Sequence, residues 1–245
     1  MSEQLFRKIF GQKKLLLAMV HLKGKTDEET LNRAKREIDI YYEEGVDAVI
    51  VENYFGNYYQ MRDALHYLNE CYPNKIYGVN SLNFDTLGFD LAIEFGASFV
   101  QLDSVVGHVK PRDEASLEVL IAQQRKREKI AVLGGVRFKY QPILSENSLK
   151  MDLQISKRRC DAVVVSGEAT GSEPSLNKIM EYRQLLGNDF PLIVGSGITA
   201  DNVTRQLEHA DGAIVGSYFK DNYKDEGEVS AEHVRKLVSV FKTLK

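Results

Sequence analysis

Two short segments late in the chain have the composition of an anion-binding backbone loop. Residues 191–199, PLIVGSGIT, and residues 212–217, GAIVGS, each contain an apolar, β-branched run that stops at a Gly-Ser pair. A buried strand followed by such a loop presents bare backbone N–H groups to an anion. A single Gly-Ser-Gly triplet is usually only a turn, but the paired segments predict a phosphate site made of Gly195, Ser196, Gly197, Gly216 and Ser217.

Ionisable side chains suited to proton transfer follow several other apolar runs. Glu52 ends the run at residues 49–51, where a partly buried carboxyl has a raised pKa unless it is paired. We therefore predict Glu52 as the proton-transfer residue and Asp103 as its partner. His21 or Lys139 is the candidate electrophile or second acid. A packed histidine is the alternative for His21, and a salt bridge with Lys139 is the alternative for Glu52.

Further polar residues near the ends of apolar runs are candidates for binding substrate. Because side chains alternate along a strand with period two, Gln101 shares a strand face with Asp103. By the same rule Arg137 shares a face with Lys139, unless both lie in a solvated loop that begins after residues 134–135. The substrate-binding candidates are Asn53, Asn80, Gln101, Arg137, Ser166 and Thr170.

The segment 166–171, SGEATG, is the most distinctive loop of the sequence. Gly167 and Gly171 allow close approach of the backbone to a ligand, and the Thr170 hydroxyl can bond to that ligand. Both glycines therefore join the phosphate-binding candidates. Residues 218–227 form a long polar segment, which is either a lid over the site or a passive solvent loop.

The sequence predicts no cofactor. By donor type alone, Glu52, Asp103 and His21 could coordinate a divalent metal ion. However, the chain contains no H-E-x-x-H or D-x-D motif that supports such a site. We therefore predict no metal ligands.

Eight apolar runs alternate with amphipathic segments along the chain, which is typical of βα units and a parallel sheet. The runs are nearly continuous in apolar residues, as expected for strands covered on both faces. A chain of 245 residues has the length of a (β/α)8 TIM barrel, in which the carboxyl ends of the strands form the active-site face. The predicted strands are Leu15–Val20, Ala48–Glu52, Ile76–Asn80, Ser98–Asp103, Ile130–Phe138, Ala162–Ser166, Leu192–Gly195 and Ala213–Gly216.

No linker or low-complexity stretch interrupts the chain, so we expect one TIM-barrel domain over residues 1–245. Residues 1–14 form an N-terminal extension, in which a helix would close the bottom of the barrel. A capping-box pattern at Thr26 opens a helix that ends at Gly45, and Ser145 marks a later helix start.

Composition limits the partners and the compartment. A net charge of −3 and a pI near 6.0 argue against nucleic-acid or membrane partners, because no global positive field attracts phosphodiesters. Cys71 and Cys160 have no metal or disulfide spacing and indicate free thiols in a reducing compartment. With no secretory signal pattern, we expect a cytoplasmic protein whose partner is a small phosphorylated ligand. A homo-oligomer remains open, since barrels often dimerise.

Six motifs follow one another along the chain: Met19-Val20-His21-Leu22, Gly45-Val46-Asp47-Ala48-Val49-Ile50-Val51-Glu52-Asn53, Gly78-Val79-Asn80, Ser166-Gly167-x-x-Thr170-Gly171, Val194-Gly195-Ser196-Gly197 and Val215-Gly216-Ser217-x-Phe219-Lys220. Together they resemble the BtpA/SgcQ family, in a match that runs in order from about Leu15 to Lys220. The resemblance implies a TIM barrel related to the phosphate-binding barrels. One branch of that family is linked to photosystem I biogenesis, and another lies among predicted sugar-uptake and carbohydrate proteins.

The chain departs from the family pattern on the fourth and fifth strands. Gln101 and Asp103 stand where Arg and Asn are usual. Gly135 replaces an Asp, and Tyr140 replaces a His. The phosphate end of the site therefore matches the family better than the reactive end.

These observations lead to one hypothesis with two rivals. The leading hypothesis is an enzyme that acts on a small phosphorylated metabolite, a sugar or ribosyl phosphate, by isomerase, epimerase or lyase chemistry. The first rival is a non-catalytic assembly or regulatory factor of the BtpA type. The second is an aldolase that forms a Schiff base through Lys139.

Overall fold

The computed structural model describes residues 2–11, 14–106, 113–127, 129–140 and 142–244, and within them eight parallel strands close into a barrel. The strands pair in chain order, and the last strand pairs with the first. The predicted (β/α)8 TIM barrel is therefore confirmed. The strands are β1 Leu15–Val20, β2 Ala48–Glu52, β3 Ile76–Asn80, β4 Phe99–Val106, β5 Ala131–Val136, β6 Ala162–Val165, β7 Leu192–Gly195 and β8 Gly212–Val215.

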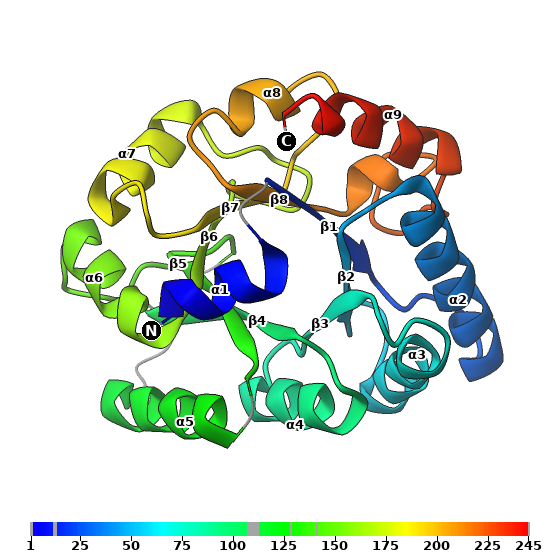
Figure 1. Cartoon of the computed structure of the whole chain (residues 1–245), viewed down its shortest axis with the longest axis horizontal. Coiled ribbons are helices and arrows are strands. Elements are labelled where there is room, and N and C mark those ends of the chain that lie inside the picture. Colours follow the sequence, from blue (N-terminus) through cyan, green and yellow to red (C-terminus); the bar gives the residue numbers. More distant parts are fainter. Residues whose placement is uncertain (1, 12–13, 107–112, 128, 141, 245) are drawn as a thin grey trace.

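The helices that connect the strands form the outer layer of the barrel (Figure 1). The signals at both ends of α2 are confirmed, because the Thr26 hydroxyl accepts the Glu29 N–H and Gly45 takes a left-handed φ of 97°. The helices are α1 Ser2–Phe10, α2 Asp27–Glu44, α3 Tyr58–Cys71, α4 Asp85–Phe95, α5 Glu114–Arg127, α6 Leu149–Arg159, α7 Leu176–Leu186, α8 Val203–Gln206, the 3₁₀ helix η1 Ser217–Phe219 and α9 Ala231–Lys242.

The start of α6 differs from the prediction. Ser148, rather than Ser145, caps this helix, since its hydroxyl accepts the Met151 N–H at 3.3 Å. The Ser145 hydroxyl instead donates to Asp152 Oδ1 at 2.8 Å. Both serines therefore form hydrogen bonds with residues of α6, but only Ser148 caps the helix backbone.

Successive strand residues point alternately to the helices and to the barrel interior. In β1, Leu16, Ala18 and Val20 belong to the apolar layer shared with the helices. Leu15, Leu17 and Met19 belong to a second cluster inside the barrel. Both faces of the strand are therefore buried, which explains why the apolar run in the sequence is continuous.

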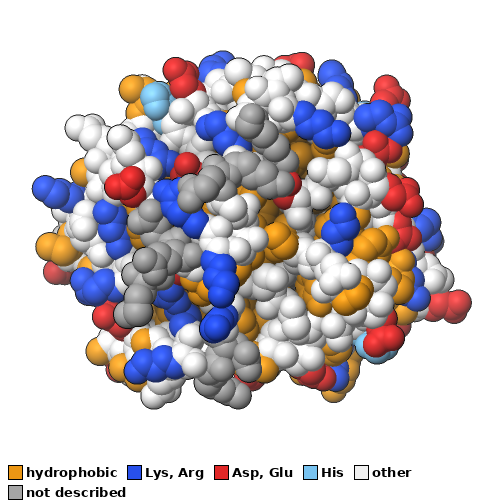
Figure 2. Space-filling view, in the orientation of Figure 1, with side chains coloured by type: hydrophobic (Ala, Val, Ile, Leu, Met, Phe, Trp, Pro, Cys, Tyr) orange, Lys and Arg blue, Asp and Glu red, His pale blue; other side chains and the backbone are white. Residues whose placement is uncertain are grey.

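Helix α1 lies across one end of the barrel (Figure 1). Its Phe6 and Phe10 are buried in the interior cluster, and the Phe10 ring lies 5.4 Å from that of Phe99 at the start of β4. The amino ends of the strands are therefore covered by apolar side chains of α1. Figure 2 shows this side of the molecule, where basic, acidic and hydrophobic side chains are interspersed.

The ends of β4 and β5 also differ from the prediction, and both differences bear on the site. β4 continues past Asp103 to Val106, with a register irregularity after Leu102. β5 stops at Val136, because Arg137 takes a left-handed φ of 50° that a strand cannot continue. Gly135 lets the two strands approach here, since a Cβ on it would lie 2.1 Å from the Asp103 carbonyl oxygen.

Candidate active site

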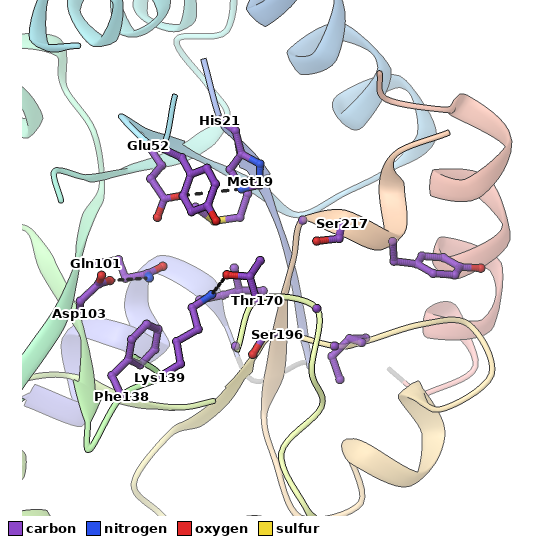
Figure 3. Close-up of a pocket in the computed structure, with 18 of the residues that line it drawn as sticks. Met19, His21, Glu52, Gln101, Asp103, Phe138, Lys139, Thr170, Ser196 and Ser217 are labelled. Carbon is purple, nitrogen blue, oxygen red and sulfur yellow. Dashed lines mark hydrogen bonds and ion pairs between the residues drawn. The ribbon is translucent and has the colours of Figure 1, made fainter. Parts of the chain in front are cut away.

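A cavity of about 670 Å³ opens at the carboxyl ends of the barrel strands. Side chains from separate strands converge on it (Figure 3). This is the face on which TIM-barrel enzymes build their active sites. Among the predicted site residues, those that line the cavity are His21, Glu52, Gln101, Asp103, Lys139, Thr170, Gly171, Gly195, Ser196, Gly197, Gly216 and Ser217.

Glu52 and Asp103 are linked through one buried amide. Strand register places Glu52 of β2 beside Asn80 of β3. Asn80 Nδ2 donates to Glu52 Oε1 at 2.7 Å and to Asp103 Oδ1 at 3.2 Å. The Asn80 side chain therefore holds the two carboxyl groups together, and its amide N–H groups are already used within the protein.

Burial shifts the pKa values of both carboxyl groups upward. Burial, followed by the negative charge of Asp103, raises the pKa of Glu52 to about 8, against opposing effects of Lys139 and the Asn80 hydrogen bond. Burial also raises the pKa of Asp103, although the bond from Asn80 and the charge of Lys139 oppose it. Glu52 is therefore mainly protonated at neutral pH, so in the resting pocket it is an acid.

His21 follows β1 and faces Glu52, with 3.7 Å between His21 Nε2 and Glu52 Oε2. Burial, followed by the positive charge of Lys220, lowers the pKa of His21 to about 4. The imidazole is therefore neutral at pH 7. The Tyr54 ring packs beside it, with 5.0 Å between ring centroids.

A buried charge cluster fixes the loop after β8, which carries the segment 218–227. Lys220 is fully buried, and its Nζ donates to Glu37 Oε1 of α2 at 2.8 Å. Glu37 Oε1 also accepts from Arg33 Nε at 3.0 Å, and Arg33 in turn bonds to the carbonyl oxygens of Glu226 and Gly227. The loop is therefore fastened to α2 and forms a fixed wall of the cavity.

Lys139 reaches into the cavity from the loop after β5. Its Nζ donates to Thr170 Oγ1 at 3.1 Å, the contact that Figure 3 marks. Lys139 has no ion pair with Glu52 or another carboxylate in the described part of the chain. Its ammonium group is therefore open to an anion, or to the carbonyl that a Schiff base requires.

Gln101 of β4 has an unused acceptor. Its Oε1 is buried with no hydrogen-bond partner among the described residues, while its Nε2 lies 3.5 Å from Asp103 Oδ1. A buried acceptor without a donor is unfavourable, so a ligand hydroxyl or N–H that reaches it gains the bond. The predicted substrate-binding role of Gln101 fits this environment.

The two Gly-Ser segments meet on the wall formed by β7 and β8, which pair directly. Ser196 takes a φ of 130°, which is uncommon for a residue other than glycine and typical of constrained sites. In the described part of the chain, the backbone N–H groups of Gly197 and Ser217 form no hydrogen bond outside regular structure. The Ser217 hydroxyl donates to Asp225, so a carboxylate adjoins this anion-binding candidate.

Packing inside the protein accounts for several of the glycines. A Cβ on Gly197 would lie 2.1 Å from the Glu173 nitrogen. A Cβ on Gly167 would lie 2.2 Å from the Ser172 carbonyl oxygen. These glycines are therefore required even without a ligand. The phosphate hypothesis consequently depends on the free N–H groups rather than on the presence of glycine.

Asn53, Ser166 and Arg137 do not line the cavity and form hydrogen bonds within the protein instead. Asn53 Oδ1 accepts the Leu82 N–H at 2.7 Å, and Ser166 Oγ accepts the Lys139 N–H at 3.0 Å. Arg137 Nε donates to buried Asp152 at 2.9 Å. The strand ends before Arg137, so the alternation that paired it with Lys139 does not extend that far. Gly167 borders a smaller neighbouring cavity of about 230 Å³.

The structure adds cavity residues that the sequence analysis did not name as site residues. Tyr218 lies in η1 and Lys236 in α9. The others lie in loops, where neither period nor motif distinguishes a lining side chain from a solvent-exposed one. The added residues are not confined to one loop. They include Tyr54, Asn83, Tyr140, Asp201, Tyr218, Tyr223 and Lys236.

The described residues contain no group of three His, Cys, Asp or Glu side chains placed to hold a metal ion. Within the same residues, none of the helices has the length and apolar character needed to span a membrane.

A model of the BtpA family matches residues 73–243 of this chain. The chain belongs to the BtpA family. It is 31% identical to an uncharacterised protein of Thermococcus kodakarensis, covering 96% of this chain and 97% of that protein. It is 26% identical to the photosystem I biogenesis protein BtpA of Synechocystis, covering 78% of this chain and 72% of that protein.

Solved TIM-barrel enzymes share the fold of this BtpA-family chain. The 3-keto-L-gulonate-6-phosphate decarboxylase of Vibrio cholerae superposes with a TM-score of 0.64 at 12% identity, over 95% of this chain and 99% of the enzyme. The phosphoribosyl anthranilate isomerase of Thermus thermophilus superposes with a TM-score of 0.63 at 13% identity, over 94% of this chain and 100% of the enzyme. At such identities the likeness establishes the fold alone.

Proposed function

We propose that this BtpA-family protein is an enzyme that transfers a proton on a small phosphorylated metabolite, a sugar or ribosyl phosphate. The observation that carries the proposal is the pair Glu52 and Asp103, bridged by Asn80 and facing a cavity with open backbone N–H groups. Two neighbouring carboxyl groups that face one cavity can serve as the acid and the base of a proton-transfer reaction.

The pocket suggests separate roles for the two carboxyl groups. Glu52, with a pKa near 8, holds a proton at neutral pH and gives it to the substrate. Asp103 accepts a hydrogen bond from the same amide and takes a proton from a neighbouring substrate carbon or hydroxyl. Removal of a proton from one atom and its return at another is an isomerisation, and its return to the opposite face of the same carbon is an epimerisation. Proton removal coupled to bond cleavage is a lyase reaction.

Other residues position the substrate and stabilise its charge. Lys139 supplies a positive charge for a developing oxyanion, and Gln101 Oε1 accepts from a substrate hydroxyl. The N–H groups of Gly197 and Ser217 bind the phosphate, whose binding energy holds the reacting atoms in place. The two solved enzymes named above have phosphorylated substrates in their names, which supports the proposal by analogy of fold.

The proposal is tested by the thermal midpoint of the protein with inorganic phosphate, a panel of sugar phosphates and the unphosphorylated sugars. A ligand at about 100 times its Kd stabilises a protein by about 2.7 kcal/mol, which raises the midpoint by several degrees. We expect one phosphorylated compound to exceed both its sugar and phosphate. Glu52→Gln should keep that shift but lose about 10²–10⁴-fold in turnover. The exposed Glu43→Gln is the matched control.

A non-catalytic assembly role is the second candidate, favoured by the name of the Synechocystis relative. On that reading Glu52→Gln has no effect on function, and no sugar phosphate raises the thermal midpoint. Turnover that persists in Glu52→Gln would show that the proton-transfer assignment is wrong.

A further inference from the structure

Two tyrosines at the mouth of the cavity are unusually exposed for aromatic side chains. Tyr140, in the loop after β5, is 65% exposed, and Tyr223, in the loop after β8, is 55% exposed. Both line the same cavity as the carboxyl groups. A ring that lines a cavity and leaves more than half of its surface in water offers apolar area to whatever enters.

Both tyrosines also have strained backbone conformations. The φ angle is 61° at Tyr140 and 58° at Tyr223. A bulky residue rarely adopts this left-handed region, and such strain concentrates at ligand-binding sites. Other described non-glycine residues with positive φ also lie in loops that follow strands, including Asn83 and Ser196 of the cavity. The strain is therefore concentrated on the face that carries the site.

Contacts with the protein hold each ring in a defined position. The Tyr140 hydroxyl accepts the Thr170 N–H at 2.6 Å, and Lys139 Nζ lies 5.9 Å from its ring centroid. The Tyr223 ring stacks on His233 of α9 at 4.5 Å and 11°, and its hydroxyl lies 3.1 Å from His233 Nε2. These rings are therefore preorganised surfaces that lose little freedom when a ligand stacks on them.

The shape of the cavity matches a two-part ligand. Its deep end holds the polar groups Glu52, Gln101 and Asp103, while Tyr140 and Tyr223 stand at the mouth. A volume of about 670 Å³ is within the range of about 300–1,000 Å³ that accommodates drug-sized ligands. A bare sugar phosphate would engage the polar end and leave both tyrosine rings unused.

We propose that the ligand of this site carries an aromatic or heteroaromatic ring, which stacks on Tyr140 and Tyr223 while its sugar phosphate occupies the deeper part. The inference rests on the proposed function and narrows its substrate class to ring-bearing sugar phosphates. Stacking on an aromatic side chain tolerates many planar rings. The proposal therefore specifies that the ligand has an aromatic ring and does not specify which ring it is.

The test compares probes that differ only in the ring. Isothermal titration calorimetry measures adenosine 5′-monophosphate against ribose 5-phosphate, and phenyl phosphate against inorganic phosphate. We expect the ring-bearing member of each pair to bind roughly tenfold tighter or more. The double variant Tyr140→Ala/Tyr223→Ala should remove that advantage without weakening ribose 5-phosphate. Tyr140→Phe/Tyr223→Phe should retain most of the advantage.

Tyr59→Ala is the matched control, since Tyr59 is 74% exposed on α3 and does not line the cavity. Equal affinities within each pair, or no binding by either ring-bearing probe, overturn the inference. If the affinities within each pair are equal and ribose 5-phosphate still binds, the ring inference fails but the proposed function stands. Conversely, unphosphorylated adenosine that binds as well as its phosphate supports the ring site and contradicts the phosphate site.

Discussion

At the scale of single residues, burial decides the chemistry of the carboxyl pair. Glu52 is 7% exposed, and its pKa of about 8 lies well above its ordinary value of 4.5. The folded state therefore binds a proton that the unfolded state releases between these two values. Its contribution to stability is complete below pH 4.5 and is lost as the pH rises toward 8.

This gives a prediction that needs no substrate. Between pH 6.5 and 8 the free energy of unfolding of the wild type should fall by about 1–2 kcal/mol relative to Glu52→Gln, because each pH unit is worth at most about 1.4 kcal/mol. The pKa of His21 falls from 6.5 to about 4 on folding, so His21 makes the free energy of unfolding rise with pH between those two values. Its effect is constant above pH 6.5 and does not alter the comparison. Urea unfolding at the two pH values measures the difference.

The exposed Glu43→Gln variant should follow the wild type across this window. If Glu52→Gln also follows it in parallel, Glu52 is ionised in the folded protein. The acid role proposed for it would then be withdrawn, and Asp103 would become the candidate proton donor.

At the scale of elements, the loop after β8 sets the electrostatics of the anion-binding candidate. Asp225 in this loop accepts hydrogen bonds from the Ser217 hydroxyl and, at 3.0 Å, from the Tyr54 hydroxyl. A phosphate bound near the Ser217 N–H meets the negative charge of Asp225. Asp225→Asn should therefore tighten the binding of inorganic phosphate several-fold at low ionic strength, with a smaller gain at high salt.

Calorimetric titration with phosphate at two ionic strengths measures this effect. Asp63→Asn, which makes the same charge change on the exposed surface of α3, should leave the affinity unchanged. Weaker phosphate binding in Asp225→Asn would mean that the carboxylate organises the site instead of opposing the anion.

The elements also show what the sequence could predict. The strands β1, β2 and β3 have the predicted bounds, because a buried parallel strand is a continuous apolar run between turn residues. β5 was predicted to reach Phe138, since its apolar pattern resumes after Arg137. The left-handed φ of Arg137 ends the strand, and a backbone angle of this kind leaves no trace in hydrophobic pattern.

The residues of the site at strand ends could be predicted from the sequence, whereas those in loops could not. Glu52, Asp103 and His21 could be predicted as cavity residues because strand ends on one face of a barrel converge. Tyr140 and Tyr223 could not, because their positions depend on backbone strain and on contacts with Thr170 and His233. Distances between loops that are far apart in sequence are set by the fold, and a single sequence does not contain them.

At the scale of the whole molecule, the barrel separates stability from function between its two ends. The cavity lies at the carboxyl ends of the strands, while α1 covers the amino ends with Phe6 and Phe10. In TIM barrels the first end carries the catalytic residues and the second contributes to stability. Changes at the α1 end should therefore alter unfolding without altering the site.

Phe10→Ala tests this separation. Phe10 is 3% exposed and contacts Phe99 inside the barrel, so its truncation should lower the free energy of unfolding by about 3 kcal/mol. The rise in thermal midpoint produced by a saturating ligand should stay the same as in the wild type. Tyr59→Ala, a similar truncation of an exposed ring, should change the free energy of unfolding by no more than about 0.5 kcal/mol. It should also leave the ligand-induced rise in thermal midpoint unchanged. A Phe10→Ala protein that folds but no longer responds to ligand would show that α1 supports the cavity through the barrel interior.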